Sequence, residues 1–189
     1  MAQALHSDYQ TDIGAFHAFM RDRPAWEKWE LIDGELIVHA TPTKRHQLIT
    51  GNLLFELETI KRGVTASWLA LIGIGTRLPG DSRNEIVPDL MVLPRASDAS
   101  NWTYHVLAAF EVLSPDSLRR DMIRKRDFYT RIDSLTHYVV LAQDRIEATI
   151  FARSDAFSPK TLAAGDRIEI APLGISLPLA EIYRDVPLG

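Results

Sequence analysis

Two short apolar segments of this 189-residue sequence each contain a single carboxylate, which limits the folds that the chain can adopt. Residues 86–93 contain Asp89, and residues 106–113 contain Glu111. Apolar runs of this length are typical of strands buried in a sheet. A carboxylate buried there without a partner would cost several kcal/mol or take up a proton. We therefore expect a buried sheet in which each acid has a cation or hydrogen-bond donors beside it.

The two acids lie 22 residues apart, on strands that can be neighbours, so one partner can serve both. Taken singly, each has a simpler interpretation: Asp89 as a turn residue at the entry to a strand, and Glu111 as half of a core salt bridge. Taken together they favour a divalent metal, because hard cations prefer carboxylate oxygens and water.

The N-terminal third predicts a helix, a hairpin and a second helix. An amphipathic helix is expected over 11–22. Asp33-Gly34 predicts a tight turn between strands 29–32 and 35–38, because this pair tolerates positive φ at both central positions. Pairing across that turn puts four residues on one face, Glu30, Ile32, Glu35 and Ile37. The second helix is expected to have Thr41 as its cap and Pro42 at its first position, and to end at Gly63.

The rest of the chain alternates between strand and helix patterns. Strands are expected at 64–78 (interrupted near Gly73 and Gly75), 86–93 and 105–113, then a helix over 114–132, a hairpin of 137–142 and 146–151, and short strands with a last helical turn within 162–183. This order predicts one domain over residues 1–189. Its α/β core is α-β-β-β-α-β with a mixed sheet, preceded by a helix and hairpin and followed by β additions.

The helix expected after Glu111 contains a third unusual charge. Its inward stripe is apolar except at Lys125, and consists of Leu118, Met122, Lys125, Tyr129 and Ile132. A helix that starts directly after Glu111 folds back over that strand, so the Lys125 ammonium can point toward the same acids. Alternatively, the Lys125 stem packs and its ammonium extends to water.

The outer face of the same helix is basic. It carries Arg119, Arg120, Arg124, Arg126 and Arg131 against Asp121 and Asp127. A solvated helix face is the usual explanation of such a strip, and a DNA backbone beside a metal site would also require it. Lys44, Arg45 and His46 begin the earlier helix, whose N-terminal amides favour anions as well.

Composition narrows the protein class further. The net charge is −4, which argues mildly against a dedicated non-specific nucleic-acid binder. The chain has no cysteine, so disulfide frameworks and thiolate zinc sites are excluded. The N-terminus has no apolar segment typical of a secretory signal, and no stretch reaches the roughly 20 apolar residues of a membrane span. A cytoplasmic protein is expected.

These motifs carry a family resemblance that runs nearly end to end. The sequence resembles the Uma-two family of restriction endonucleases, in the PD-(D/E)xK nuclease superfamily. The matching segments are Val87-Pro88-Asp89-Leu90, Phe110-Glu111-Val112-Leu113-Ser114-Pro115, the spaced Asp121, Lys125 and Tyr129, Trp29-Glu30-Leu31-Ile32-Asp33-Gly34, the helix start from Pro42 to Gln47 with His46, and Tyr138-Val139-Val140. The ordered spacing of these blocks makes the resemblance more specific than the Pro88-Asp89 pair alone.

The resemblance implies hydrolysis of DNA phosphodiesters with Mg²⁺ or Mn²⁺ as cofactor. The implied metal ligands are Asp89 and Glu111, with Glu30 favoured over Glu35 as the third acid. The lysine expected two residues after the glutamate is Leu113 here, so Lys125 would replace it from the helix. His46 is then a residue that hydrogen-bonds the phosphate or a ligand, although histidines at helix starts often only cap the helix.

Three functions remain open at this point. The leading hypothesis is a DNA endonuclease with catalytic residues Asp89, Glu111, Lys125 and His46, acting as a homodimer because duplex cleavage uses paired sites. Its expected DNA contacts are Arg119, Arg120, Arg124 and Lys44. The alternatives are a catalytically degenerate nucleic-acid-binding module of the same fold and another metal-dependent phosphoester hydrolase. The fold alone does not choose among them.

Overall fold

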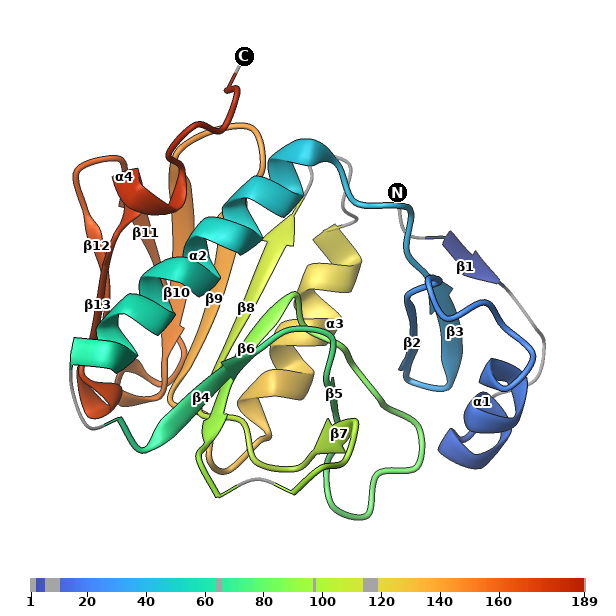
Figure 1. Ribbon diagram of the computed structural model, residues 1–189. Helices are drawn as coiled ribbons and strands as arrows, with labels where there is room; N and C mark the ends of the chain where they lie inside the picture. Colours follow the sequence, from blue (N-terminus) through green and yellow to red (C-terminus); the bar gives the residue numbers. More distant parts are fainter. Residues whose placement is uncertain (1–2, 6–10, 64–65, 97, 114–118, 189) are drawn as a thin grey trace.

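A six-stranded mixed sheet forms the centre of the molecule (Figure 1). The computed structural model describes residues 3–5, 11–63, 66–96, 98–113 and 119–188. The strands in spatial order are β11 (Pro159–Ala163), β10 (Glu147–Ala152), β9 (His137–Ala142), β8 (Ala108–Leu113), β6 (Leu90–Pro94) and β4 (Trp68–Leu71). β8 and β9 pair in parallel, whereas the other neighbours are antiparallel.

Helices α2 (Lys44–Gly63) and α3 (Arg119–Thr130) cover opposite faces of this sheet (Figure 1). Side chains alternate along β8, so Phe110 joins the core beneath α2 while Ala109 joins the core that contains Tyr129 of α3. Glu111 therefore points to the α3 side. The parallel crossover from β8 through α3 to β9 explains why a helix follows Glu111 so closely.

The N-terminal elements form a separate layer beside α3 (Figure 1). Helix α1 (Ile13–Met20) accompanies a small sheet with strand order β1 (Gln3–Leu5), β3 (Glu35–Val38) and β2 (Trp29–Ile32). The predicted turn is confirmed, because Asp33 and Gly34 both have positive φ, at 53° and 83°. The register pairs Glu30 with Ile37 and Ile32 with Glu35, so the predicted face is also correct.

The C-terminal part adds short β elements, as the sequence predicts. They are a two-stranded sheet of β12 (Arg167–Ile170) and β13 (Ile175–Pro178), the last helix α4 (Leu179–Ile182) and two 3₁₀ turns, η1 (Arg153–Asp155) and η2 (Ala171–Leu173). Apolar residues of these strands, such as Ile168 and Leu177, pack into the core beneath α2. A further parallel pair joins β5 (Gly75–Thr76) with β7 (Trp102–Thr103) in a separate two-stranded sheet.

The fold class is thus confirmed, while some predicted boundaries are wrong. Helix α2 begins at Lys44 rather than at Thr41 and Pro42. Its cap is Thr43, whose hydroxyl oxygen accepts a hydrogen bond from the His46 N–H at 3.2 Å. Helix α1 is shorter than 11–22, because Asp12 caps it by accepting from the Ala15 N–H at 2.8 Å.

The predicted strand 86–93 also starts later than expected. Pro88 has no N–H to give to a ladder, and the Val87 N–H donates to a Glu30 oxygen at 2.9 Å, so regular pairing begins only at Leu90. Asp89 consequently lies at a bend just before β6. The predicted start of α3, at Ser114-Pro115-Asp116, lies outside the described residues.

Candidate active site

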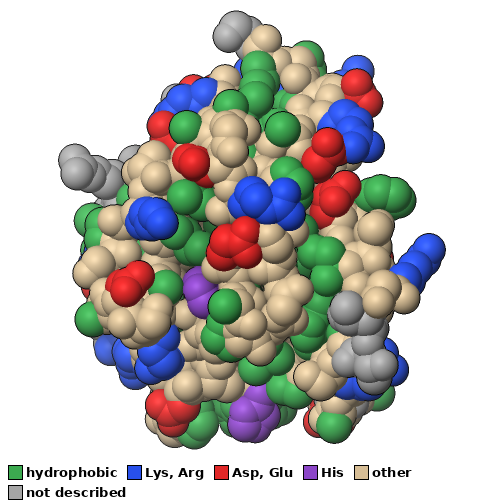
Figure 2. All heavy atoms as spheres, turned by 90° about the vertical axis from the view of Figure 1, so that its left-hand side faces the viewer, with side chains coloured by type: hydrophobic (Ala, Val, Ile, Leu, Met, Phe, Trp, Pro, Cys, Tyr) green, Lys and Arg blue, Asp and Glu red, His purple; other side chains and the backbone are tan. Residues whose placement is uncertain are grey.

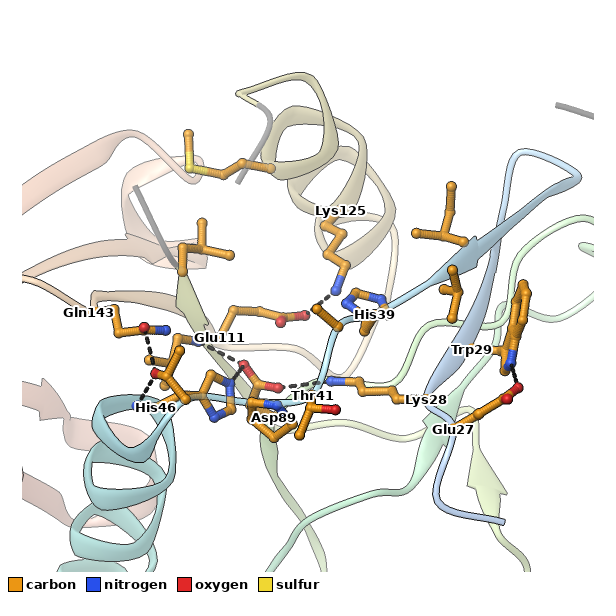
Figure 3. Close-up of a pocket in the computed structure, with 18 of the residues that line it drawn as sticks. Glu27, Lys28, Trp29, His39, Thr41, His46, Asp89, Glu111, Lys125 and Gln143 are labelled. Carbon is orange, nitrogen blue, oxygen red and sulfur yellow. Dashed lines mark hydrogen bonds and ion pairs between the residues drawn. The ribbon is translucent and has the colours of Figure 1, made fainter. Parts of the chain in front are cut away.

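Three carboxylates from different parts of the chain lie close together beside α3, and Figure 3 shows two of them, Asp89 and Glu111. Glu111 comes from the middle of β8, Asp89 from the bend before β6, and Glu30 from β2 of the N-terminal sheet. Glu30 is fully buried and Glu111 is 2% exposed. Asp89 and Glu111 line a cavity of about 540 Å³, bounded by β2, β3, α3 and the start of α2.

The floor of this site consists of Glu30, Glu111, Lys125 and Tyr129. The Lys125 ammonium donates to a Glu30 oxygen at 2.9 Å and to a Glu111 oxygen at 3.0 Å. The Tyr129 hydroxyl donates to the same Glu111 oxygen at 3.0 Å. All four side chains are buried, so the alternative in which Lys125 extends to water is wrong. The predicted contact between Lys125 and Glu111 is present.

Burial and charge act on the floor in opposite directions. Burial disfavours ionisation of Glu30, but the Lys125 ammonium and His39 outweigh it and hold the pKa of Glu30 well below its usual range. Burial raises the pKa of Glu111, and the attraction of Lys125 offsets this only in part because Asp89 adds repulsion. Burial would lower the pKa of Lys125, yet Glu111 and Glu30 raise it above its ordinary value. The two carboxylates therefore favour the ammonium form of Lys125.

The rim of the site consists of Lys28, His46 and Asp89 (Figure 3). One Asp89 oxygen accepts from the Lys28 ammonium at 2.8 Å. The other accepts from the Val112 N–H at 2.8 Å and lies 3.0 Å from His46 Nε2. Burial raises the pKa of Asp89, but Lys28 and His46 outweigh it and bring that pKa well below its usual range. Asp89 is thus a carboxylate held by three groups from other segments of the chain, the Lys28 ammonium, the Val112 N–H and the His46 ring.

Sequence reasoning missed two members of the site, Lys28 and His39. His39 Nε2 lies 2.6 Å from the second Glu30 oxygen, and the His39 N–H donates to the Lys28 carbonyl at 2.9 Å. The two residues extend the hairpin by one pair, on the face of Glu30 and Ile37. The two-residue period of strands was the signal that could have found them, if the predicted hairpin had been extended beyond Trp29 and Val38.

The basic strip on α3 is largely paired with acids of this chain. Arg124 donates to Asp33 and Glu35 of the hairpin, in each case at 2.8 Å. Arg126 pairs with Asp127 and Arg131 pairs with Asp81. The side chains of Arg119 and Arg120 lie outside the described residues. Lys44 is exposed at the start of α2.

Charges of both signs are also mixed on the face formed by the C-terminal strands (Figure 2). There Arg145 pairs with Glu147 and Arg167 pairs with Glu169. On this face, as on α3, the described basic side chains therefore do not form a continuous basic surface.

Within the described ranges of the chain, no helix is long and apolar enough to cross a membrane.

The site is better suited to a divalent cation that keeps several water ligands than to one that is held entirely by protein ligands. Among the side chains that the structure describes, no three His, Asp or Glu groups are placed to hold a metal ion together. Both Glu30 oxygens already accept hydrogen bonds, from Lys125, Val87 and His39. Mg²⁺ commonly uses one or two carboxylates and keeps several waters. Asp89 and Glu111, which open to the cavity, fit that requirement.

The charge balance of the site also fits a cation. With all three carboxylates ionised and the histidines neutral, Glu30, Asp89 and Glu111 carry three negative charges against the two ammonium groups of Lys28 and Lys125, a balance of −1. The Lys28 ammonium already places a positive charge against Asp89, and the Lys28 side chain is 32% exposed. The buried Nδ1 of His46, the ring nitrogen that does not face Asp89, has no hydrogen-bond partner among the described residues.

The family profile of Uma2, described as "Putative restriction endonuclease", matches residues 15–180. The chain belongs to this family. The match includes Glu30, Asp89, Glu111 and Lys125, so all the charged residues of the floor lie within the family region. The resemblance expected from the sequence is therefore confirmed.

A solved structure with a similar fold supports the fold class. The chain is similar to a structure titled as a putative nuclease belonging to DUF820 from Anabaena variabilis, with a TM-score of 0.73 and 13% sequence identity. The superposition covers 87% of this chain and 94% of the other. No match was found among curated proteins. At this identity the likeness establishes the restriction-endonuclease-like fold and leaves the chemistry to the site.

Proposed function

We propose that this protein is a metal-dependent nuclease that hydrolyses DNA phosphodiester bonds in the cavity beside Asp89 and Glu111. The observation that carries the proposal is the position of Lys125. Its ammonium is buried between Glu30 and Glu111, at the wall of an open cavity that Asp89 also lines. A buried lysine that joins two acids at a cavity is a common feature of functional sites.

Asp89 and Glu111 are the side chains that would hold Mg²⁺ or Mn²⁺. When bound, such an ion lowers the pKa of its water and neutralises charge on a phosphoryl group. Glu30 is better suited to fixing Lys125 than to binding metal, because it is fully buried, does not line the cavity and accepts hydrogen bonds from Lys125, Val87 and His39. Glu30 thus becomes a positioning residue, whereas the sequence favoured it as a third ligand.

Lys125 is assigned the stabilisation of negative charge on the phosphate. Because its neighbours raise its pKa, it remains an ammonium and a hydrogen-bond donor rather than a general base. This role does not require a lysine at Leu113, two residues after Glu111. His46 lines the cavity and keeps Asp89 in place through Nε2.

DNA contacts are proposed at Lys44 and at Arg119 and Arg120. Lys44 is exposed at the N-terminus of α2, where backbone amides attract phosphate. Arg124 is a weaker candidate than the sequence suggested, because Asp33 and Glu35 occupy its guanidinium. The homodimer and the cytoplasmic location stay predictions.

A nicking assay on supercoiled plasmid with Mn²⁺ tests the proposal most directly. We expect nicking by the wild type, loss of nicking on chelation, and loss in Asp89→Ala. Leu113 favours one alternative, a module that binds DNA without cleaving it: metal-dependent binding with no nicking would support that alternative. Hydrolysis of small phosphoesters with no action on DNA would instead indicate a different phosphoester hydrolase.

A further inference from the structure

The cavity is larger than its proposed chemistry requires. Its volume is about 540 Å³. Six water-sized ligands around a divalent ion take up about 180 Å³, at about 30 Å³ each. The remaining space has the dimensions of a small-molecule site, since such pockets usually measure roughly 300–1,000 Å³. Something besides a hydrated ion therefore fits there.

The walls away from the carboxylates are mostly apolar. The hairpin supplies Ile32, Ile37 and Val38, the end of β8 supplies Leu113, and α3 supplies Met122. Trp26, in the turn before β2, lines the same cavity and is 79% exposed. A tryptophan left this open beside an apolar cavity offers a face on which a flat ring can stack.

The charges of the molecule argue against tight binding to duplex backbone alone. Duplex binding depends largely on Lys and Arg contacts with phosphates. The described arginines at positions 124, 126 and 131 of this chain are paired with its own acids, and the net charge is −4. Stacking of bases on aromatic side chains is the other main source of affinity for nucleic acid.

A paired base cannot use these walls, because its two faces are stacked and its edge is bonded to the opposite strand. An unpaired base exposes an apolar ring that is covalently joined to a phosphate only a few bonds away. The cavity presents carboxylates for a metal-bound phosphate and apolar walls within the same space. Both parts of one nucleotide can therefore lie in it together.

We propose that the cavity binds an unpaired nucleotide, with its phosphate at Asp89 and Glu111 and its base against Trp26, Leu113 and Met122. The preferred substrate is then single-stranded or locally unpaired DNA rather than intact duplex. This inference rests on the proposed nuclease function and adds a substrate class to it.

The test measures binding rather than cleavage. A labelled single-stranded oligonucleotide and its duplex are titrated with protein, with Ca²⁺ in place of Mn²⁺ because it shares the preference for oxygen ligands. The variants are Trp26→Ala and a matched control, Phe55→Ala. Phe55 is 63% exposed on α2 and does not line the cavity. Both positions are exposed, so both variants should keep the wild-type melting temperature.

We expect Trp26→Ala to weaken single-strand binding by about 5- to 150-fold, equivalent to about 1–3 kcal/mol for one stacked base. Phe55→Ala should have no effect, and the weaker duplex binding should be the same in all three proteins. A series of oligonucleotides carries one abasic site at successive positions. The wild type should bind one of them markedly more weakly than the intact strand, whereas the affinity of Trp26→Ala should change little along the series.

Several results would overturn the inference while leaving the nuclease proposal intact. One is plasmid nicking together with equal binding of both DNA forms, a flat abasic scan and no effect of Trp26→Ala. Another is self-association of the wild type that Trp26→Ala abolishes without changing DNA binding, which would make a second copy of the chain the occupant. Absence of both binding and nicking would contradict the proposed function itself.

Discussion

The floor and the rim of the carboxylate site both pair a lysine with carboxylates, but the lysine of the floor is buried and the lysine of the rim is partly exposed. In the floor, Lys125 joins Glu30 and Glu111 inside the protein, and Tyr129 completes the bonding of Glu111. In the rim, Lys28 contacts Asp89 from a side chain that is one third exposed. Moving Lys125 would leave two buried carboxylates uncompensated, whereas water can replace Lys28. We infer a fixed ammonium in the floor and an exchangeable one in the rim.

The largest effect is expected from Lys125→Met, which removes the fixed charge. Breaking a buried ion pair from one side typically costs about 3–5 kcal/mol of folding stability. We expect a loss of that size in urea unfolding, and a loss of phosphodiesterase rate of about 10²-fold or more where the fold persists. A double variant with Glu30→Gln should recover part of the stability and none of the rate. Unchanged stability in Lys125→Met would contradict a fixed floor.

Metal removal tests the two proposed ligands, Glu111 in the floor and Asp89 in the rim. Binding only to the native state stabilises it by about 2.7 kcal/mol at an ion concentration of 100 times Kd. Mn²⁺ or Mg²⁺ should therefore raise the melting temperature of the wild type, and EDTA should reverse the rise. Asp89→Ala and Glu111→Ala should both abolish it. If the rise persisted in both variants, the metal would bind elsewhere.

Lys28→Met tests whether the rim is exchangeable. Its ammonium occupies an Asp89 oxygen that a cation would use, so its removal should tighten Mn²⁺ binding by about 10-fold, or about 1.4 kcal/mol, in calorimetry without DNA. Lys160→Met, the same change on the exposed strand β11, is the matched control and should leave the affinity unchanged.

Labelling of amines adds a direct measurement of the exchange. Mn²⁺ should increase the modification rate of Lys28 and leave buried Lys125 unmodified. Equal affinities in the wild type and Lys28→Met, with Lys28 equally protected with and without metal, would show that the rim is as fixed as the floor.

The smallest effect concerns the arginines of α3. A double variant that removes both Arg119 and Arg120 should make the slope of log affinity against log salt concentration shallower. The expected change is about 0.9 for each phosphate that the protein no longer neutralises. Arg124→Met should leave that slope unchanged, because Asp33 and Glu35 hold its guanidinium. A change of slope in Arg124→Met would show that DNA displaces those acids.

Local sequence patterns predict the fold and part of the site, whereas contacts between distant segments are not predictable from them. Asp-Gly, the apolar strands and the inward lysine are local patterns, and they correctly predict the hairpin, the order of elements and the contact between Lys125 and Glu111. The pairing of Lys125 with Glu30 was not predictable, because it depends on how the N-terminal sheet packs beside α3. Lys28 and His39 were missed because the predicted strands stopped at Trp29 and Val38, one pair before the residues that continue the face of Glu30.

The separation of Glu30 and Lys125 along the chain has a consequence for synthesis. The two residues are 95 positions apart, with the first in the hairpin and the second in the crossover helix after β8. The hairpin leaves the ribosome long before that helix. A chain that ends before residue 125 contains Glu30 without Lys125, so it lacks this ion pair. Under the proposed nuclease function, a product truncated before that point cannot cut DNA.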